Sequence, residues 1–315
     1  MSWWLAARGG RARHYRAAMK IGLSLPTMLG SGDGSGINRS SLLAWCRRIE
    51  DDGYDTLGIG ERISYRNLEM FSVLSAAAAV TERVRLASTI VVLPMHSEVW
   101  VAKQTATLDV LSGGRVTLGV GVGGRREDYD ALGRSFDHRF QRLDDQVERI
   151  RSVWAGDPPG AGLEPVGPTP IQEHLPILSG SMGPKSLARS AVWADGIAGF
   201  EMDPALPSLE RSARAMTDAW DAAGRSTSPH RMTSFWFSLG DDAEERLRGY
   251  ARHYLAIFGA ELADALAASC TAAGTDGVRR AIDACRDAGF DEIQLVPTSA
   301  DLGELDQLSS IVHTE

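Results

Sequence analysis

Cysteine is scarce in this sequence, and no apolar run in it is long. Its 315 residues include three cysteines, which are far apart and form neither a CxxC pair nor a Cys/His set. The sequence therefore indicates no disulfide framework and no metal site, and it favours a reducing, cytoplasmic location. The most apolar stretch, residues 84–94, is interrupted by Arg85 and Ser88 and is much shorter than the roughly 20 residues that span a bilayer. No membrane segment is predicted.

Positive charge is also in deficit. The 33 basic residues stand against 41 acidic ones, and the net charge of −8 argues against a general nucleic-acid-binding protein, which needs a cationic surface. The chain has no GxSxG, HExxH or GxxxxGK[ST] motif, so the usual signatures of hydrolases, zinc peptidases and phosphate-loop NTPases are missing. The composition, 43% apolar and 23% charged, is typical of a globular protein that buries a core.

The first eighteen residues differ from the rest. They place a short apolar patch before arginines, the reverse of the order in a signal peptide, so secretion is not expected. We interpret residues 1–18 as an N-terminal extension, either a basic interaction arm or a disordered or non-native start, with Met19 as an alternative first residue. Residues 19–315 are expected to form a single domain.

From residue 19 onward, strand-length apolar runs alternate with longer segments that carry apolar residues at helical spacing. Eight candidate strands result, and eight is the number that closes a (β/α)8 TIM barrel. A doubly wound open sheet is the rival fold, but the GxGxxG motif expected after its first strand is missing. Residues 30–36 are then a flexible rim loop, and residues 156–172 and 199–207 are candidates to cover the mouth. The strands are expected to begin near Ile21, Tyr54, Val84, Arg115, Pro176, Gly196, Met232 and Glu292.

Two glycine-rich segments follow predicted strands and are candidates for ligand contact. Residues 119–124 lead into Arg125, so the backbone can approach a ligand closely and an arginine can meet negative charge; the alternative is a crowded strand that needs small residues. Residues 179–183 lead into a helix that begins at Pro184, where free N–H groups and hydroxyls suit a phosphate or form an ordinary cap. The candidate residues are Gly119, Gly121, Gly123, Gly124, Ser179, Gly180, Ser181, Met182 and Gly183.

Polar groups also end the second and third predicted strands. Glu61 and Arg62 follow the second strand, and His96 follows the third. A histidine at the rim suits proton transfer because the pKa of imidazole lies near neutrality. The alternative is structural: a local ion pair for Glu61 and Arg62, and a capping role for His96.

Residues 84–133 resemble the signature region of the bacterial luciferase-like monooxygenases and their coenzyme F420-dependent relatives. AKQTATLDVLSGGR, at 102–115, is the most specific part. The similarity continues at 142–156 and 176–196 and returns in GFDEIQLVP near the end, so it covers about four fifths of the chain. This resemblance implies a (β/α)8 barrel that binds reduced FMN or coenzyme F420 at its C-terminal rim and oxidises or reduces a small organic molecule.

The resemblance also implies where the cofactor lies. Ser88 and Thr89 would stand behind its ring, at a bulge where the family often has a non-prolyl cis peptide. Residues 119–124 would approach the ring or the ribityl chain, and residues 179–183 would hold the phosphate.

Catalytic roles follow less directly from the resemblance. His96 matches the first of two histidines in some flavin-using members, whereas Ser97 replaces the second. Glu61 and Arg62 stand where F420-using relatives have an aspartate and a histidine.

The implied reaction uses reduced FMN, supplied by a separate flavin reductase, and O2 to oxidise a small molecule. F420-dependent hydride transfer, silent flavin binding and isomerase or lyase chemistry are the alternatives. Relatives also imply a homo-oligomer, formed through the helices that follow the second and third strands.

Overall fold

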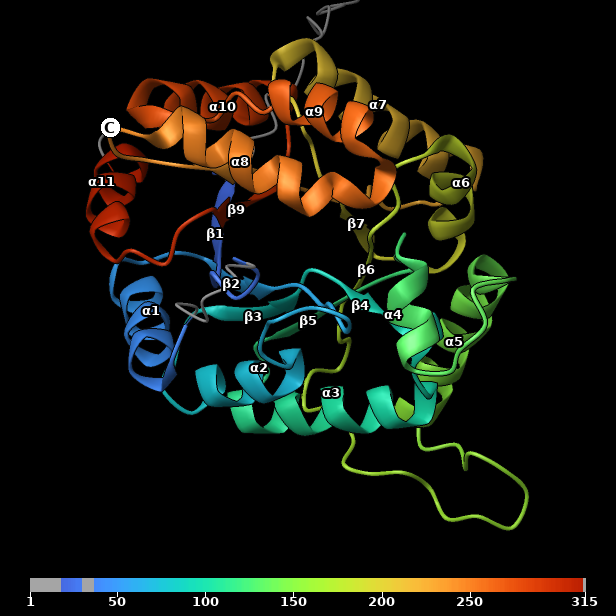
Figure 1. Cartoon of the computed structure of the whole chain (residues 1–315). Helices are drawn as coiled ribbons and strands as arrows, with labels where there is room; N and C mark the ends of the chain where they lie inside the picture. Colours follow the sequence, from blue (N-terminus) through green and yellow to red (C-terminus); the bar gives the residue numbers. More distant parts are fainter. Residues whose placement is uncertain (1–17, 30–36, 314–315) are drawn as a thin grey trace, which may run out of the picture.

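The computed structural model describes residues 18–29 and 37–313 (Figure 1). The predictions for residues 1–17 and for the loop 30–36 concern residues outside these ranges. The strands are β1 (Lys20–Ser24), β2 (Thr56–Ile59), β3 (Arg85–Ser88), β4 (Val91–Val92), β5 (Val116–Gly121), β6 (Ile177–Ser179), β7 (Gly196–Ala198), β8 (His230–Phe237) and β9 (Glu292–Pro297).

Helices separate most of these strands along the chain. The α-helices are α1 (Arg39–Asp51), α2 (Met70–Ala78), α3 (Glu98–Ser112), α4 (Arg126–Ala131), α5 (Arg139–Trp154), α6 (Pro184–Trp193), α7 (Leu206–Ala222), α8 (Ala243–Leu255), α9 (Ala260–Ala268), α10 (Gly274–Ala288) and α11 (Gly303–Val312). Two short 3-10 helices, η1 (Leu93–Met95) and η2 (Ala256–Phe258), complete the set. None of the helices in the described ranges combines the length and the apolar character needed to cross a bilayer.

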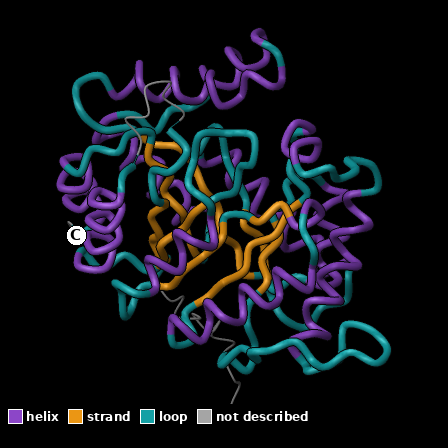
Figure 2. The backbone as a smooth tube through the Cα atoms, turned by 60° about the horizontal axis from the view of Figure 1, so that its bottom comes forward, coloured by secondary structure: helices purple, strands orange, loops and turns teal. Residues whose placement is uncertain are grey.

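The strands close into one parallel barrel. Their order is β3-β2-β1-β9-β8-β7-β6-β5-β4, and β3 also pairs with β5, which joins the two ends of the sheet. The predicted eight-stranded barrel is confirmed, with one difference: its third strand is split into β3 and β4. The split falls at Thr89 and Ile90, whose peptide bond is cis, at the place where the resemblance implies such a bond. Figures 1 and 2 show the helices surrounding the strands.

The main apolar core lies between the barrel wall and the helices. Leu23, Leu57 and Leu86 of neighbouring strands are fully buried and belong to one cluster with Trp45 of α1 and Leu74 of α2. Because successive side chains of a strand point to opposite faces, the alternate positions of these strands face the barrel interior. The outer face of the barrel wall therefore packs against the helices, and the inner face lines the barrel interior.

The barrel interior is polar and tightly filled at its N-terminal end. Gln294 of β9 lies against Gly22 and Gly58, and a Cβ atom on Gly22 would stand 2.2 Å from Gln294 Oε1. Beside it, the Oε1 atom of Glu292 accepts a hydrogen bond of 2.6 Å from Thr56 Oγ1. This packing closes the N-terminal end of the barrel, so ligand space is left at the C-terminal end.

The loop 156–172 does not cover the mouth, contrary to the expectation from its length and composition. It joins the end of α5 to the start of β6, and such a connection returns the chain to the N-terminal end of the barrel. Gln172 shows the placement directly: its Nε2 atom donates to Asp109 Oδ1 at 2.6 Å and to the Val116 carbonyl, at the start of β5, at 2.9 Å. In Figure 1 the loop extends outward below α3, away from the strands.

The mouth is covered instead by the chain between β8 and β9. In Figure 1, α8 and α9 lie across one side of the barrel. Tyr250, Tyr254 and Leu255 of α8 and Ile257 and Phe258 of η2 line the cavity beneath. The sequence predicts helices in this region but gives no sign that they close the mouth.

Candidate functional site

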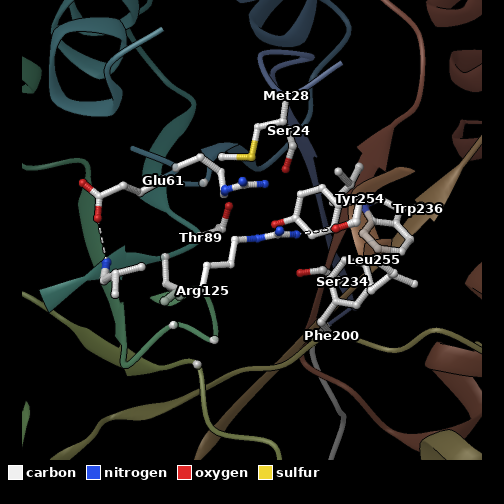
Figure 3. Close-up of a pocket in the computed structure, with 18 of the residues that line it drawn as sticks. Ser24, Met28, Glu61, Thr89, Arg125, Phe200, Ser234, Trp236, Tyr254 and Leu255 are labelled. Atoms are coloured by element: carbon white, nitrogen blue, oxygen red, sulfur yellow. Dashed lines mark hydrogen bonds between the residues drawn. The ribbon is translucent and has the colours of Figure 1, made fainter. Parts of the chain in front are cut away.

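A cavity of about 320 Å³ opens at the C-terminal ends of the barrel strands (Figure 3). Residues directly after β2, β3 and β5 form one side, and β8 and α8 form the opposite side. Of the predicted site residues, the cavity brings together Glu61, Arg62, Thr89, Gly123, Gly124, Arg125, Gly180 and Met182. Phe200, from the segment 199–207 that is a candidate to cover the mouth, also lines the cavity, and members that the sequence does not single out include Met28, Asp128, Ser234, Trp236 and Tyr254.

An aromatic cluster forms the wall under α8. The ring of Trp236 meets the rings of Phe200, Tyr254 and Tyr250 edge to face, with centroids 4.7, 5.2 and 5.6 Å apart. Burial raises the pKa of Tyr250 above its ordinary value, so this phenol stays neutral at physiological pH. The wall is therefore aromatic and uncharged, and it suits a flat ligand. These residues come from β8, α8 and the loop after β7, and each carries the helical or strand pattern of an ordinary core residue.

Arg62 lies deep in the cavity. Its side chain is 6% exposed, and its Nε atom is 3.3 Å from Oδ2 of Asp128, which is 5% exposed. The guanidinium carbon lies 4.3 Å from the ring centre of Tyr65 and 5.7 Å from that of Tyr254. Asp128 is held in turn, because its Oδ1 atom accepts from the backbone N–H of Ser64 at 2.6 Å. Of the structural alternatives for Glu61 and Arg62, a mutual or a local ion pair, the structure shows local pairs: Arg62 with Asp128, and Glu61 with His96.

The second of these pairs joins Glu61 and His96. Its Oε2 atom accepts a hydrogen bond of 2.8 Å from the Val92 N–H, and its Oε1 atom is 2.9 Å from Nε2 of His96. Glu61 lines the main cavity, but His96 lines a separate open hollow of about 670 Å³ beside α5. The predicted catalytic histidine thus reaches the cavity through the carboxylate of Glu61. Figure 3 shows Glu61 at the edge of the cavity, with its bond to the backbone dashed.

Arg125 spans the cavity from the loop after β5 toward α8 (Figure 3). Its Nη2 atom donates to the carbonyl oxygen of Tyr254, and its guanidinium carbon lies 4.7 Å from the centre of the Tyr254 ring. The predicted cofactor-binding arginine therefore ties the covering helix to the rim. Arg126 lies outside this cavity, with its guanidinium 4.5 Å from the ring centre of Phe136.

A second, smaller cavity of about 200 Å³ adjoins the first and shares Gly180 and Met182 with it. Ser181, Gly183, Ser186 and Arg189 also line it, around the N-terminus of α6. The first N–H groups of a helix have no partner within the helix, so this end is a ready anion site. Arg189 is paired there with Asp144, which lines the same cavity, so this pair is close to neutral and the N–H groups and hydroxyls are the donors left for an anion.

Within and below residues 179–183, three serine hydroxyl groups are hydrogen-bonded to one another. The Oγ atoms of Ser179, Ser181 and Ser190 are 2.7 to 2.8 Å apart. Ser179 is completely buried and does not line either cavity, so its place is below the predicted phosphate site. Ser181 and Ser190 both line the smaller cavity, so these two members of the set reach the ligand space.

The predicted glycines divide into two groups. A Cβ on Gly119 would stand 2.2 Å from the Ser88 carbonyl oxygen, and a Cβ on Gly121 would stand 2.4 Å from Ile90 Cδ1. These two positions need glycine because the split third strand crosses there, as in the steric alternative, and Gly121 also lines the smaller cavity. Ser88 serves the same crossing, since its Oγ atom accepts from the Gly119 N–H at 2.8 Å. Gly124, by contrast, faces open space in the main cavity.

Within residues 18–29 and 37–313, no group of three or more His, Cys, Asp and Glu side chains is arranged to hold a metal ion. The three cysteines are buried and free. The main cavity presents two carboxylates, two guanidinium groups and several aromatic rings, and the imidazole of His96 stands behind Glu61.

A closed parallel barrel with its cavities at the C-terminal strand ends places the protein among the (β/α)8 barrels that carry their sites at that rim. A family within this fold class can also be assigned. Residues 19–306 match the family described as luciferase-like monooxygenase, and the chain belongs to that family.

Individual relatives match only part of the chain, at moderate sequence identity. An uncharacterised protein of Mycobacterium tuberculosis (strain ATCC 25618 / H37Rv) is 33% identical over 175 residues, which cover 52% of this chain and 60% of that protein. The matched segment thus spans about three fifths of that relative's length.

Two solved structures share the fold at lower identity. An F420-dependent secondary alcohol dehydrogenase, in complex with an F420-acetone adduct, superposes with a TM-score of 0.76 at 19% identity over 93% of this chain and 98% of its own. The oxygenating constituent of 3,6-diketocamphane monooxygenase of Pseudomonas putida, in complex with FMN, gives 0.68 at 17% identity over 93% and 96%.

Proposed function

We propose that this protein is a flavin-dependent oxidoreductase that uses reduced FMN and O2 to oxidise a small organic molecule. The observation that carries the proposal is the pair of adjoining cavities. One is broad and aromatic, the other is narrow and lies at a helix N-terminus, and they share Gly180 and Met182. A cofactor with a flat ring and a phosphorylated side chain matches this pair of shapes.

The residues present fit such a cofactor. Gly124 faces open space in the larger cavity, so a ring can approach its backbone. In the smaller cavity, a Cβ on Gly183 would have Ser186 Oγ, at 3.8 Å, as its nearest neighbour, which leaves room for a phosphate beside α6. Ser181, Gly183 and Ser186 would hold the phosphate, and Thr89 and Gly124 would face the ring.

Reduced FMN supplies the electrons for the oxidation when it is bound. The chain supplies the surroundings. The aromatic wall of Phe200, Trp236 and Tyr254 excludes water from the reacting face. Glu61 is placed to pass a proton between a ligand in the cavity and His96, which lies 2.9 Å away and borders the open hollow. A separate flavin reductase completes the proposal as the source of reduced FMN.

The proposal is tested by titrating the full chain with FMN and, in parallel, with coenzyme F420, while the absorbance spectrum is recorded. We expect FMN to bind with a spectral shift. Binding of F420 alone would move the proposal to hydride transfer, and binding without any consumption of reduced cofactor, O2 and donor would indicate a silent binder. Absence of a shift with either compound overturns the proposal.

Gly183→Asp tests the phosphate site without disturbing the helix. Aspartate is a preferred N-cap residue, so α6 stays stable, but its carboxylate repels a phosphate. We expect FMN to bind at least tenfold more weakly to Gly183→Asp, whereas Gly183→Asn, an equally good cap without charge, binds as the parent does. Equal affinity of the two variants would place the phosphate elsewhere.

A further inference from the structure

The charged groups that line the main cavity are unequally satisfied. Each oxygen of the two carboxylates has a partner: Glu61 contacts His96 and the Val92 N–H, and Asp128 contacts the backbone N–H groups at 63 and 64 and Arg62. Arg62 is not. Its Nε and Nη1 atoms are buried and have no hydrogen-bond partner among the described residues, although Nε lies within ion-pair distance of Asp128.

A guanidinium carries five N–H donors, and leaving them unmet in a buried place is unfavourable. The rings of Tyr65 and Tyr254 lie against the group, but they compensate its charge without accepting conventional hydrogen bonds. The side chain is only 6% exposed, and it lines the cavity. Its unused donors therefore indicate that a ligand with anionic oxygen atoms completes the site.

The neighbouring wall indicates the rest of that ligand. The guanidinium groups of Arg62 and Arg125 lie 5.7 and 4.7 Å from the ring centre of Tyr254, which is 5.2 Å from that of Trp236. Figure 3 shows Tyr254, Trp236 and Phe200 together on the side of the cavity opposite Glu61 and Thr89. An anionic group at Arg62 would thus have a flat aromatic surface directly beside it. The phosphate cavity lies on the other side, beyond Gly180 and Met182.

We infer that the organic substrate is a small aromatic carboxylate, with its carboxylate on Arg62 and its ring against Trp236 and Tyr254. The inference rests on the proposed function, because it names the substrate class of the same site. Arginine and carboxylate match in geometry as well as in charge, since the planar fork presents parallel N–H groups to two oxygens. The cavity volume of about 320 Å³, shared with a cofactor ring, limits the substrate to about one ring.

The experiment uses benzoate and its uncharged isostere benzamide as probes, with binding to the full chain measured by calorimetry in the presence and absence of FMN. We expect benzoate to bind at least tenfold more tightly than benzamide, and to bind together with FMN. Equal affinity for the two probes would overturn the inference. Competition between benzoate and FMN would also overturn it, because Arg62 would then belong to the cofactor site.

Variants assign the preference to one residue. Arg62→Met removes the donors while keeping a long side chain between the tyrosine rings, and we expect it to abolish the preference for benzoate. Arg126→Met makes the same change in charge on the same rim but outside the cavity, and it should leave the preference intact. Arg62→Lys retains the charge without the fork, so a partial loss is expected if Arg62→Met does not fold. An unchanged preference in both Arg62 variants contradicts the assignment.

The result is separable from the proposed function. If neither FMN nor F420 binds but benzoate still binds through Arg62, the proposed reaction is wrong and the carboxylate site stands. If FMN binds in the two cavities but benzoate shows no preference over benzamide, the cofactor assignment stands and the substrate class is wrong.

Discussion

Glu61 connects two compartments of the molecule. One of its carboxylate oxygens faces His96, and the residue itself lines the cavity in which the cofactor ring and the substrate are proposed to meet. His96 borders a hollow of about 670 Å³ that is open to solvent. Proton transfer between ligand and solvent along this pair would explain why a carboxylate and an imidazole are held together at the rim.

Replacing Glu61 by Gln tests this path. We expect kcat to fall about a hundredfold with little change in KM, within the range found for general acid–base groups. Glu98→Gln, at the border of the same hollow, is the matched control and should keep nearly full activity. His96→Ala should also lose activity, and added imidazole should restore part of it because the hollow is open. Failure of imidazole to restore any rate would assign His96 a structural role.

The residues of this site differ in how far the sequence reveals them. Glu61, Arg62 and His96 are visible because they directly follow predicted strands, and chain direction places all such residues on one rim. Asp128 is not, because it meets Arg62 across more than sixty residues and lies in a short helix with no motif of its own. Tyr254 and Trp236 follow core-like patterns, and their exposure to a cavity depends on the packing of α8.

At the scale of elements, residues 102–115, the most specific part of the family resemblance, have a structural role. Gly113 and Gly114, which follow α3, have φ angles of 69° and 84°, so the chain turns sharply there and leads into β5. Arg115 follows and is buried. Its guanidinium donates to the carbonyl oxygens of Val84 at 2.6 Å and of Thr81 at 2.8 Å, beyond the end of α2. The family signature thus joins two βα units at the end of the barrel opposite the site.

We expect Arg115→Met to lower the free energy of unfolding by roughly 3 kcal/mol, because several buried carbonyl groups lose a charged donor. The measurement is urea unfolding, followed by circular dichroism. Arg280→Met, on the exposed face of α10, should change the same quantity by less than about 0.5 kcal/mol. FMN affinity should be unaffected by Arg115→Met in protein that is still folded, and a selective loss of FMN binding would contradict the structural role.

Connections between elements are where sequence reasoning fails. The loop 156–172 is long and rich in proline and glycine, which indicates a loop but not the face on which it lies. Its position between a helix and the next strand decides that it lies at the N-terminal end. The segment between β8 and β9 follows a strand instead, so α8 and η2 lie over the site.

At the scale of the whole molecule, the N-terminal end of the barrel is filled by polar side chains, and the C-terminal end carries the cavities. Chain direction and the regular alternation of strand and helix make the barrel predictable. The polar filling of its N-terminal end is not predictable, because it depends on which residues of eight strands face inward at the same level. The homo-oligomer stays a prediction. Trp100, Val110 and Leu111 are exposed apolar residues of α3, one of the helices proposed to form the contact.

Glu292 is the charged member of the polar filling. It is 6% exposed, and its Oε2 atom lies 2.9 Å from Nε2 of His230. Burial alone would raise the pKa of Glu292, but hydrogen bonds from His230 and Thr56 outweigh it, and the pKa lies below its ordinary value of 4.5. A carboxylate with a lowered pKa in the folded state stabilises the protein fully above its ordinary pKa, and this stabilisation is lost as the pH falls through the folded-state value.

Glu292→Gln therefore gives a pH-dependent difference in stability. At pH 7 we expect the variant to be less stable by roughly 2 kcal/mol, because a buried charged acceptor of two hydrogen bonds is replaced by a neutral amide. As the pH falls below the ordinary pKa of 4.5 and through the lowered folded-state value, the two Tm curves should converge, since protonation removes the advantage of the parent. Glu210→Gln, on the exposed face of α7, should follow the parent at every pH. Parallel curves for the parent and Glu292→Gln, measured by thermal unfolding from pH 3 to pH 7, would contradict the lowered pKa of Glu292, and coincident curves would mean that the interior tolerates a neutral group as well as a charged one.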